Sequence, residues 1–258
     1  MHYTETVLEA KKMACSDAEW IARAELACAY RQFYRLGWHE LIYNHISLRV
    51  PGEPGHFLIN PFGLMYNEVC ASNLVKIDID GNIIGTSDYP INPAGFVVHS
   101  AVHRVRHDAN CVMHTHTTSG MAVAGMEDGL LPVSFPAMFF TDTVAYHEFE
   151  GITLDDDERE RLASNLGERN VMILRNHGLL SCGVNVAAAF SELYNLQRAC
   201  DVQVAMLSMG GAIHHPGTGI AKRVTLQFNK VARQGSQNDL MFTAVFRNIL
   251  RTDPDLLS

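Results

Sequence analysis

The sequence predicts a single α/β domain in which one β-sheet carries helices on both faces. Stretches with helical apolar periodicity alternate with short β-like runs along the chain, and no segment is repeated. Hydrophobic residues make up 47% of the chain and charged residues 19%, which is enough to bury a full core. The 258 residues fall within the range of one large domain, and no composition shift divides them. We therefore expect one domain over residues 16–258, preceded by a loose arm over residues 1–15.

The first half of the chain predicts two helices and three strands. Ser16-Asp17-Ala18-Glu19 is a capping box that opens a helix running to Leu36, and Gly37 ends it. The Asn92-Pro93-Ala94-Gly95 segment suits the entry of a second helix, which we expect over residues 96–106. Strands are expected over residues 46–50, 57–59 and 75–79.

The second half continues the same alternation. Strands are expected over residues 111–116, 133–135, 143–146, 171–175 and 179–182. Helices are expected over residues 120–125, 155–166, 186–209 and 239–250. Outside the last of these helices, the final forty residues give no clear pattern.

Charge and cysteine usage exclude several classes of protein. The chain has 28 acidic and 20 basic residues, a net charge of −8, and no basic run, so nucleic acid is not an expected partner. The N-terminus lacks the apolar segment of a signal peptide, and no stretch approaches the roughly 18 apolar residues of a membrane span. None of the six cysteines forms a C-x-x-C pair, which is typical of buried reduced thiols. We expect a cytoplasmic protein that binds no membrane.

Three histidines are candidate metal ligands. His114 and His116 are two residues apart in a predicted strand, so both side chains point to the same face of the sheet. His177 lies in an Arg-Asn-His-Gly turn between two predicted strands. Three imidazoles with an open fourth position are typical of catalytic zinc sites, although imidazole also binds Mn, Fe and Co. An H-x-H pair alone is more often a surface or structural feature, and spacing does not connect His177 to it.

A series of sequence blocks gives that connection. In order along the chain these blocks are Tyr43–Ser47, Asn60–Gly63, Leu74–Asp78, His99, Asp108–His116 and Leu174–Gly178. In them the chain resembles the class II aldolase/adducin family, and most closely the head domain of adducin and its bacterial relatives. The resemblance implies a three-layer α/β/α domain with a mostly antiparallel sheet. It also implies a homotetramer with sites near the subunit interfaces.

The resemblance also implies a metal site. The family's aldolases hold zinc through the histidines that match His114, His116 and His177, so we expect one divalent metal per subunit, with zinc first and Mn, Fe or Co as alternatives. The aldolases have an acid/base glutamate four residues before the histidine that matches His99. That position here is Gly95, which cannot transfer a proton.

The loops that bind substrate in the family also differ. The resemblance places Asn44, Ser47, Phe62, Gly63 and Gly95 at the substrate site. Phe62, and Pro93 and Ala94 in the second loop, offer no side-chain donor where phosphate-binding aldolases have small hydroxyl residues. A sugar phosphate is therefore not expected. Asn44 and Ser47 are equally well explained as turn residues that hydrogen-bond to their own backbone.

These features predict a metal-dependent carbon–carbon lyase of aldolase or decarboxylase type. Its substrate would be a small non-phosphorylated hydroxy or keto acid or carbonyl compound, held by the metal. Decarboxylation agrees best with Gly95, because breaking a C–CO₂ bond needs no base. His99 and Tyr146 are the candidate proton donors, against a buried core histidine and a surface loop as alternatives; His147, Glu148 and Glu150 are weaker candidates.

Two other functions remain open. The first is a metal-binding protein whose active site has decayed. The second is an adducin-like binding or scaffold protein, since the resemblance to the adducin head includes the loss of the glutamate. Actin is not an expected partner, because nothing in the chain matches the neck and basic tail of adducin.

Overall fold

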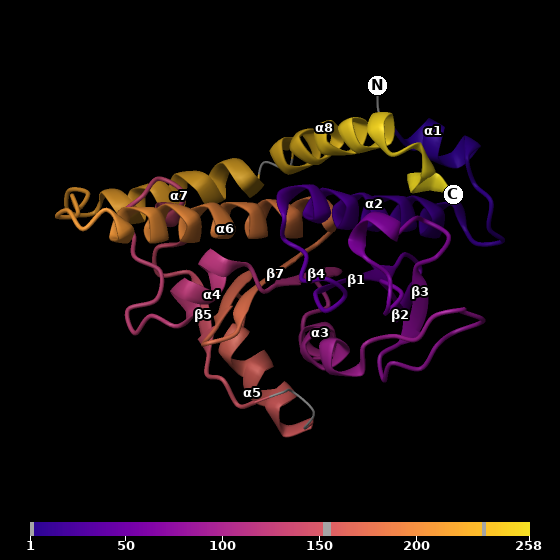
Figure 1. Cartoon of the computed structure of the whole chain (residues 1–258), viewed down its shortest axis with the longest axis horizontal. Helices are drawn as coiled ribbons and strands as arrows, with labels where there is room; N and C mark the ends of the chain where they lie inside the picture. Colours follow the sequence, from indigo (N-terminus) through magenta and orange to yellow (C-terminus); the bar gives the residue numbers. More distant parts are fainter. Residues whose placement is uncertain (1–2, 152–155, 234–235) are drawn as a thin grey trace.

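The computed structural model describes residues 3–151, 156–233 and 236–258, and within them a seven-stranded sheet lies between two layers of helices (Figure 1). The strand order is β3-β2-β1-β4-β7-β6-β5. The strands are β1 (His45–Val50), β2 (Glu53–Ile59), β3 (Val75–Asp78), β4 (Cys111–Thr115), β5 (Val144–His147), β6 (Val171–Leu174) and β7 (Gly178–Gly183). The predicted α/β architecture is confirmed, and β4 lies at the centre of the sheet.

The sheet is mixed. Among the described strands, five neighbouring pairs are antiparallel and one pair, β5 with β6, is parallel. The parallel pair arises because the chain crosses between β5 and β6 through a helix, and parallel neighbours need such a crossover. The strand predicted over residues 133–135 does not form. Pro132 and Pro136 flank it and cannot donate a ladder hydrogen bond, which disfavours a strand there.

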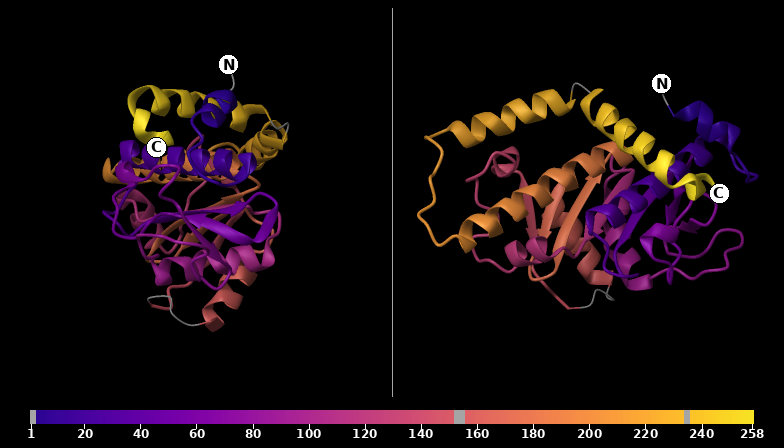
Figure 2. Two further views of the ribbon diagram at one scale, coloured as in Figure 1. Left: turned by 90° about the vertical axis from the view of Figure 1, so that its right-hand side faces the viewer. Right: turned by 45° about the horizontal axis from the view of Figure 1, so that its top comes forward.

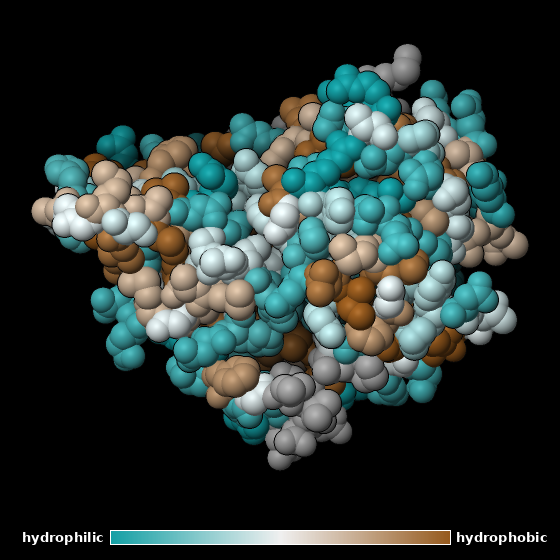
Figure 3. All heavy atoms as spheres, in the orientation of Figure 1, coloured by the Kyte–Doolittle hydropathy of each residue, from teal (hydrophilic) through white to brown (hydrophobic). Residues whose placement is uncertain are grey.

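The helices divide between the two faces of the sheet, as the views in Figures 1 and 2 show. One face carries α1 (Thr4–Glu9), α2 (Asp17–Leu36), α4 (Thr118–Ala124), α6 (Val186–Ser208) and α8 (Ser236–Thr252). The other face carries α3 (Pro93–Val105) and α5 (Asp156–Leu166). Each face has its own buried core, so a strand such as β6 is buried at every residue. Hydrophilic side chains gather over α2 and α8 in the view of Figure 3.

Local signals explain where the helices begin and end. Ser16 Oγ accepts a hydrogen bond from the backbone N–H of Glu19, and Gly37 closes α2 at φ 71°, so both predicted ends are confirmed. The Asn92 side chain caps α3, which begins at Pro93, three residues before the predicted start, because proline suits the first turn. The helix predicted from residue 155 begins at Asp156; residue 155 itself lies outside the described residues.

Two segments differ from the predictions. The N-terminal arm is not loose, because it contains α1, Val7 is fully buried, and the ring of Tyr3 stacks on Phe246 of α8 at 3.9 Å. The chain after α6 forms a helix, α7 (Ile220–Arg233), that was not predicted. This helix packs on the short helix η2 (Ala137–Phe140), where Phe228 stacks on Phe139 at 4.2 Å. The two remaining short helices are η1 (Tyr66–Glu68) and η3 (Pro254–Leu257).

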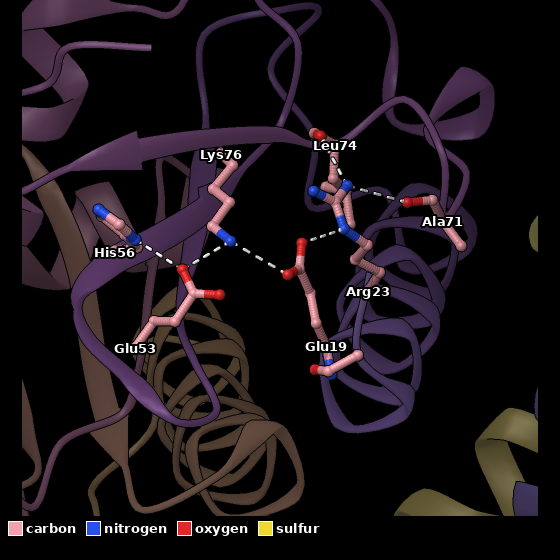
Figure 4. A network of polar contacts seen from close by, with 8 residues as sticks. Glu19, Arg23, Glu53, His56, Ala71, Leu74 and Lys76 are labelled. Carbon is pink, nitrogen blue, oxygen red and sulfur yellow. Dashed lines mark hydrogen bonds and ion pairs between the residues drawn. The ribbon is translucent and has the colours of Figure 1, made fainter. Parts of the chain in front are cut away.

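A polar network joins α2 to the β3 edge of the sheet (Figure 4). Glu19 pairs with Arg23 at 2.9 Å and with Lys76 at 3.1 Å, and all three side chains are largely buried. Arg23 also donates to the carbonyl oxygens of Ala71 and Leu74. Because the network satisfies these buried charges, it fixes α2 against the sheet without leaving an unpaired ion.

All six cysteines are unpaired, and five of them are buried, which agrees with the expected buried thiols. Among the described residues, no helix is both long and apolar enough to cross a membrane.

Glu192 on α6 gives a prediction about pH. Burial raises its pKa from 4.5 to about 7, and a hydrogen bond with Asn170 offsets only part of this. Between pH 4.5 and 7 the folded state therefore binds more protons than the unfolded state, and stability falls as pH rises through this window. At pH 8 we expect Glu192→Gln to raise the free energy of unfolding by about 1–2 kcal/mol relative to the parent, after allowance for the partial exposure of the side chain. At pH 4 the two proteins should have the same free energy of unfolding. A difference independent of pH in urea titrations would contradict this assignment.

Candidate metal centre

The three predicted ligands meet at one end of the central strands. His114 lies on β4, His116 follows directly after it, and His177 lies in the turn between β6 and β7. Asn176 makes this tight turn possible by adopting a left-handed conformation, φ 55°. The Nε2 atom of His116 lies 2.7 Å from Nε2 of His114 and 3.0 Å from Nε2 of His177. One ligand atom from each residue falls within 4.8 Å of the others, so these residues form one possible metal site.

The hydrogen bonds of His114 and His116 fix where their protons lie. Nδ1 of His114 is 2.9 Å from the carbonyl oxygen of Leu179, which can only accept, so this Nδ1 carries the hydrogen. Nδ1 of His116 contacts a carboxylate oxygen of Glu40, which places the hydrogen of that ring on Nδ1 as well. With the hydrogen on Nδ1 alone, the two rings point Nε2 lone pairs at one another. A cation between the lone pairs would relieve their repulsion, and so the donor set suits a divalent metal.

Burial keeps the rings of His114 and His177 neutral. It lowers the pKa of His114 well below its usual value and that of His177 to about 4, and the neighbouring His116 lowers both further. Neutral imidazole is the form that ligates a metal, so these two residues need to release no proton near neutral pH.

Glu40 is a site residue that the sequence did not reveal. It lies in the loop between α2 and β1, beside Leu41, whose φ of 50° is in the left-handed region. Its carboxylate contact with Nδ1 of His116 is the supporting contact that orients metal-binding histidines. A single carboxylate in an irregular loop has no periodicity or spacing that would mark it in a sequence.

We expect Glu40→Gln to weaken metal binding by about 10–100-fold, because the amide holds His116 less firmly and makes its ring less basic. Competition with a chromophoric chelator measures this affinity. Glu148→Gln removes an exposed carboxylate outside the pocket and should bind metal as the parent does. Equal affinities for parent and Glu40→Gln would rule out a supporting role for Glu40.

The histidines open into a pocket of about 470 Å³, a size suited to a small ligand. Glu40, His45, Gly95 and the three candidate ligands are among the residues that line it. Tyr43, Met121 and Phe149 are exposed side chains at its walls, and the Phe149 ring lies 6.0 Å from that of His177.

Only one of the five predicted substrate-binding residues lies in the pocket wall of this chain, and that is Gly95. Asn44 is buried and donates through Nδ2 to the carbonyl oxygen of Trp38, as expected of a turn residue. Ser47 is fully buried between two histidines. Phe62 and Gly63 lie in the loop after β2, outside the pocket lining.

The two predicted proton donors do not contact the pocket. His99 is fully buried, and its Nε2 lies 2.6 Å from Nδ1 of His45, so it reaches the pocket only through His45. Tyr146 does not line the pocket of this chain, because strand alternation turns it to the opposite face of the sheet from His147. Its hydroxyl accepts from the backbone N–H of Leu130, and the Arg175 guanidinium lies 4.4 Å from its ring centre.

The weaker candidates are also held elsewhere. Nδ1 of His147 pairs with Asn165 at 2.8 Å, and Glu150 forms an ion pair with Arg161. Glu148 is exposed and does not line the pocket.

The chain is similar to known proteins over most of its length. Residues 24–204 match the profile of the Class II Aldolase and Adducin N-terminal domain. A Pseudomonas aeruginosa protein, named only at the level of an aldolase class 2 protein, is 46% identical over 242 residues, 93% of each chain. The crystal structure of an aldolase II superfamily protein from Pseudomonas syringae is 45% identical with a TM-score of 0.91, over 95% of this chain and 98% of that one. Alpha-adducin of Mus musculus is 47% identical over 202 residues, 77% of this chain but 27% of adducin. The chain therefore belongs to the class II aldolase/adducin family.

Proposed function

We propose that this chain is a divalent-metal-dependent carbon–carbon lyase, of aldolase or decarboxylase type, that acts on a small non-phosphorylated hydroxy or keto acid or carbonyl compound. The observation that carries the proposal is the pair of Nε2 lone pairs on His114 and His116, which face each other at the inner end of an open pocket. Membership of the class II aldolase family supports the general reaction type.

His114, His116 and His177 would hold one metal ion. Zinc is the first choice for three imidazoles, with Mn, Fe or Co as alternatives. When bound, such a metal would supply Lewis-acid catalysis by withdrawing electron density from an oxygen atom of the substrate. The carbonyl oxygen of Leu179 and the carboxylate of Glu40 keep two of the rings turned toward the ion.

The described pocket lining supports a small substrate without phosphate. It contains no lysine and no arginine, and its polar side chains beside the histidines are Glu40, Tyr43, Asn92 and Asn176. A phosphate dianion placed there would lack a cationic side chain, whereas a single carboxylate could be held by the metal and an amide.

The experiment is a turnover screen of the full chain loaded with Zn²⁺, Mn²⁺, Fe²⁺ or Co²⁺. Small hydroxy and keto acids are assayed for release of CO₂ and of aldehyde or ketone, with sugar phosphates in parallel. We expect the parent to turn over an unphosphorylated acid, and we expect the His114→Ala variant to have lost this activity. Turnover of sugar phosphates alone would overturn the substrate class, and no turnover with any metal would overturn the lyase.

A second candidate function is a binding or scaffold protein on a decayed site, favoured by the 47% identity to alpha-adducin. This function predicts no turnover, whether or not the site binds metal. Actin is not proposed as a partner. We further propose a cytoplasmic homotetramer, as the family resemblance implies, and analytical ultracentrifugation of the purified chain tests the assembly.

A further inference from the structure

His45 occupies the space in front of Gly95. A Cβ atom at residue 95 would lie 2.3 Å from Cδ2 and 2.4 Å from Nε2 of His45, so no side chain fits there while this ring stays in place. His45 lies on β1 directly across from His114 on β4, and the centres of the two rings are 5.2 Å apart. The imidazole of His45 therefore fills the space that a side chain at residue 95 would enter, the position where the resemblance implies a glutamate in the family's aldolases.

A buried chain of hydrogen bonds starts at His45 and runs away from the pocket. Nδ1 of His45 lies 2.6 Å from Nε2 of His99, and Nδ1 of His99 lies 2.6 Å from Oγ of Ser47. Oγ of Ser47 lies 2.8 Å from Nε2 of His103, and Nδ1 of His103 lies 3.1 Å from the carbonyl oxygen of Ala109. We call this series of His45, His99, Ser47 and His103 the relay. His45 is 5% exposed, and the other three side chains of the relay are 1% exposed or less.

The far end of the relay sets the direction of every hydrogen bond in it. The Ala109 carbonyl can only accept, so Nδ1 of His103 donates and its Nε2 accepts the hydroxyl hydrogen of Ser47. Ser47 Oγ then accepts from Nδ1–H of His99, and Nε2 of His99 accepts from Nδ1–H of His45. When all three rings are neutral, Nε2 of His45 is the one nitrogen of this series whose lone pair accepts no hydrogen bond.

This lone pair is available to a ligand. His45 lines the pocket, and Nε2 has no hydrogen-bond partner among the residues that the structure describes. His45 is also not part of the three-histidine cluster whose ligand atoms lie within 4.8 Å of one another. The relay thus presents one acceptor, of fixed direction, beside the candidate metal site.

We propose that Nε2 of His45 accepts a hydrogen bond from the hydroxyl group of the metal-bound ligand, and that it thereby selects 2-hydroxy acids over the corresponding 2-keto acids. This inference rests on the proposed function, since it takes a metal-bound small acid as the ligand. A hydroxyl group donates a hydrogen bond to this lone pair, whereas a keto oxygen has no hydrogen to donate and forms no hydrogen bond with it. His99, Ser47 and His103 are positioning residues that hold the acceptor.

The test uses the full chain loaded with Co²⁺, whose visible spectrum reports ligand binding. Titrations with lactate and pyruvate compare a hydroxy acid with its keto counterpart. We expect the parent to prefer lactate by about 10-fold or more, the scale of one hydrogen bond to a buried acceptor. His45→Phe should lose this preference while still binding one Co²⁺, and His45→Gln, which keeps an acceptor, should retain part of it.

A second readout does not depend on the metal. Nitrogen-15 NMR of the metal-free chain should show the His45 ring protonated on Nδ1 and unprotonated on Nε2, and Ser47→Ala should produce a mixture of the two neutral forms. A hydrogen on Nε2 of the parent would overturn the proposal. So would an unchanged lactate preference in His45→Phe, or loss of Co²⁺ from that variant, since the lone pair would then be a metal ligand.

The outcomes separate this proposal from the proposed function. If the parent binds Co²⁺ but binds lactate and pyruvate with equal affinity, the proposed selection by His45 is wrong and the lyase proposal is unaffected. If the parent binds neither metal nor acid, the proposed function fails and the selection fails with it, while the NMR result still decides how the ring of His45 is protonated.

Discussion

The purified chain is expected to contain about one equivalent of divalent metal, and a double variant with His114→Ala and His116→Ala is expected to contain none. The two residues supply the facing Nε2 atoms, 2.7 Å apart, and only His177 would be left in the candidate site. Loss of a supporting partner alone weakens metal sites by about 10–100-fold, so loss of two ligands should exceed about 1000-fold. Elemental analysis after dialysis measures the stoichiometry.

The matched control removes two other imidazoles. His214 and His215 are exposed in the loop between α6 and α7, so replacing both by alanine should leave the metal content unchanged. Circular dichroism of both double variants checks that they are folded. Retention of metal by the His114→Ala, His116→Ala variant would place the ion elsewhere. If the parent stays metal-free even after incubation with metal, the lyase proposal fails and the binding or scaffold function remains.

The predictable part of the site follows from strand geometry. The alternation of β4, continued one residue beyond its end, places His114 and His116 on one face, and their rings are in contact. His177 is 61 residues further along the chain, and it reaches them only because β7 pairs with β4 and β6 pairs with β7. Spacing cannot reveal such a pairing, so the family resemblance was needed to connect the third histidine.

The residues that sequence reasoning missed or misplaced depend on tertiary packing. Glu40 lies in a loop whose path depends on the positive φ of Leu41, and His45 is identified only by its contact with Gly95. His99 was correctly expected on a helix beside the metal strand, but His45 separates it from the pocket. Tyr146 is turned away from the pocket of this chain, because the register of the four-residue strand β5 decides which face each side chain takes.

Gly178→Ala at the start of β7 should cause the largest loss of stability that we expect, because the backbone is closely packed there. A Cβ at this position would lie 2.3 Å from the backbone carbonyl oxygen of Thr115 and 3.2 Å from Cδ2 of His116. Backbone in a central strand cannot move aside cheaply, so we expect a loss of about 3 kcal/mol, or roughly 6–12 °C in Tm. Because Thr115 lies between the candidate ligands His114 and His116, the folded fraction should also bind metal more weakly.

Gly183→Ala at the other end of β7 separates the two effects. Its Cβ would lie 2.6 Å from the backbone nitrogen of Ala189, so it should destabilise the fold to a similar degree by pressing on the start of α6. Gly183 pairs with Cys111, at the end of β4 away from His114, and the atoms nearest to its added Cβ belong to Ala188 and Ala189. Below its Tm this variant should therefore bind metal as tightly as the parent. Thermal unfolding in a chelator measures stability without metal, and chelator competition at low temperature measures affinity. Equal losses of metal affinity in the two variants would mean that general loosening of the sheet, and not displacement of Thr115, controls the site.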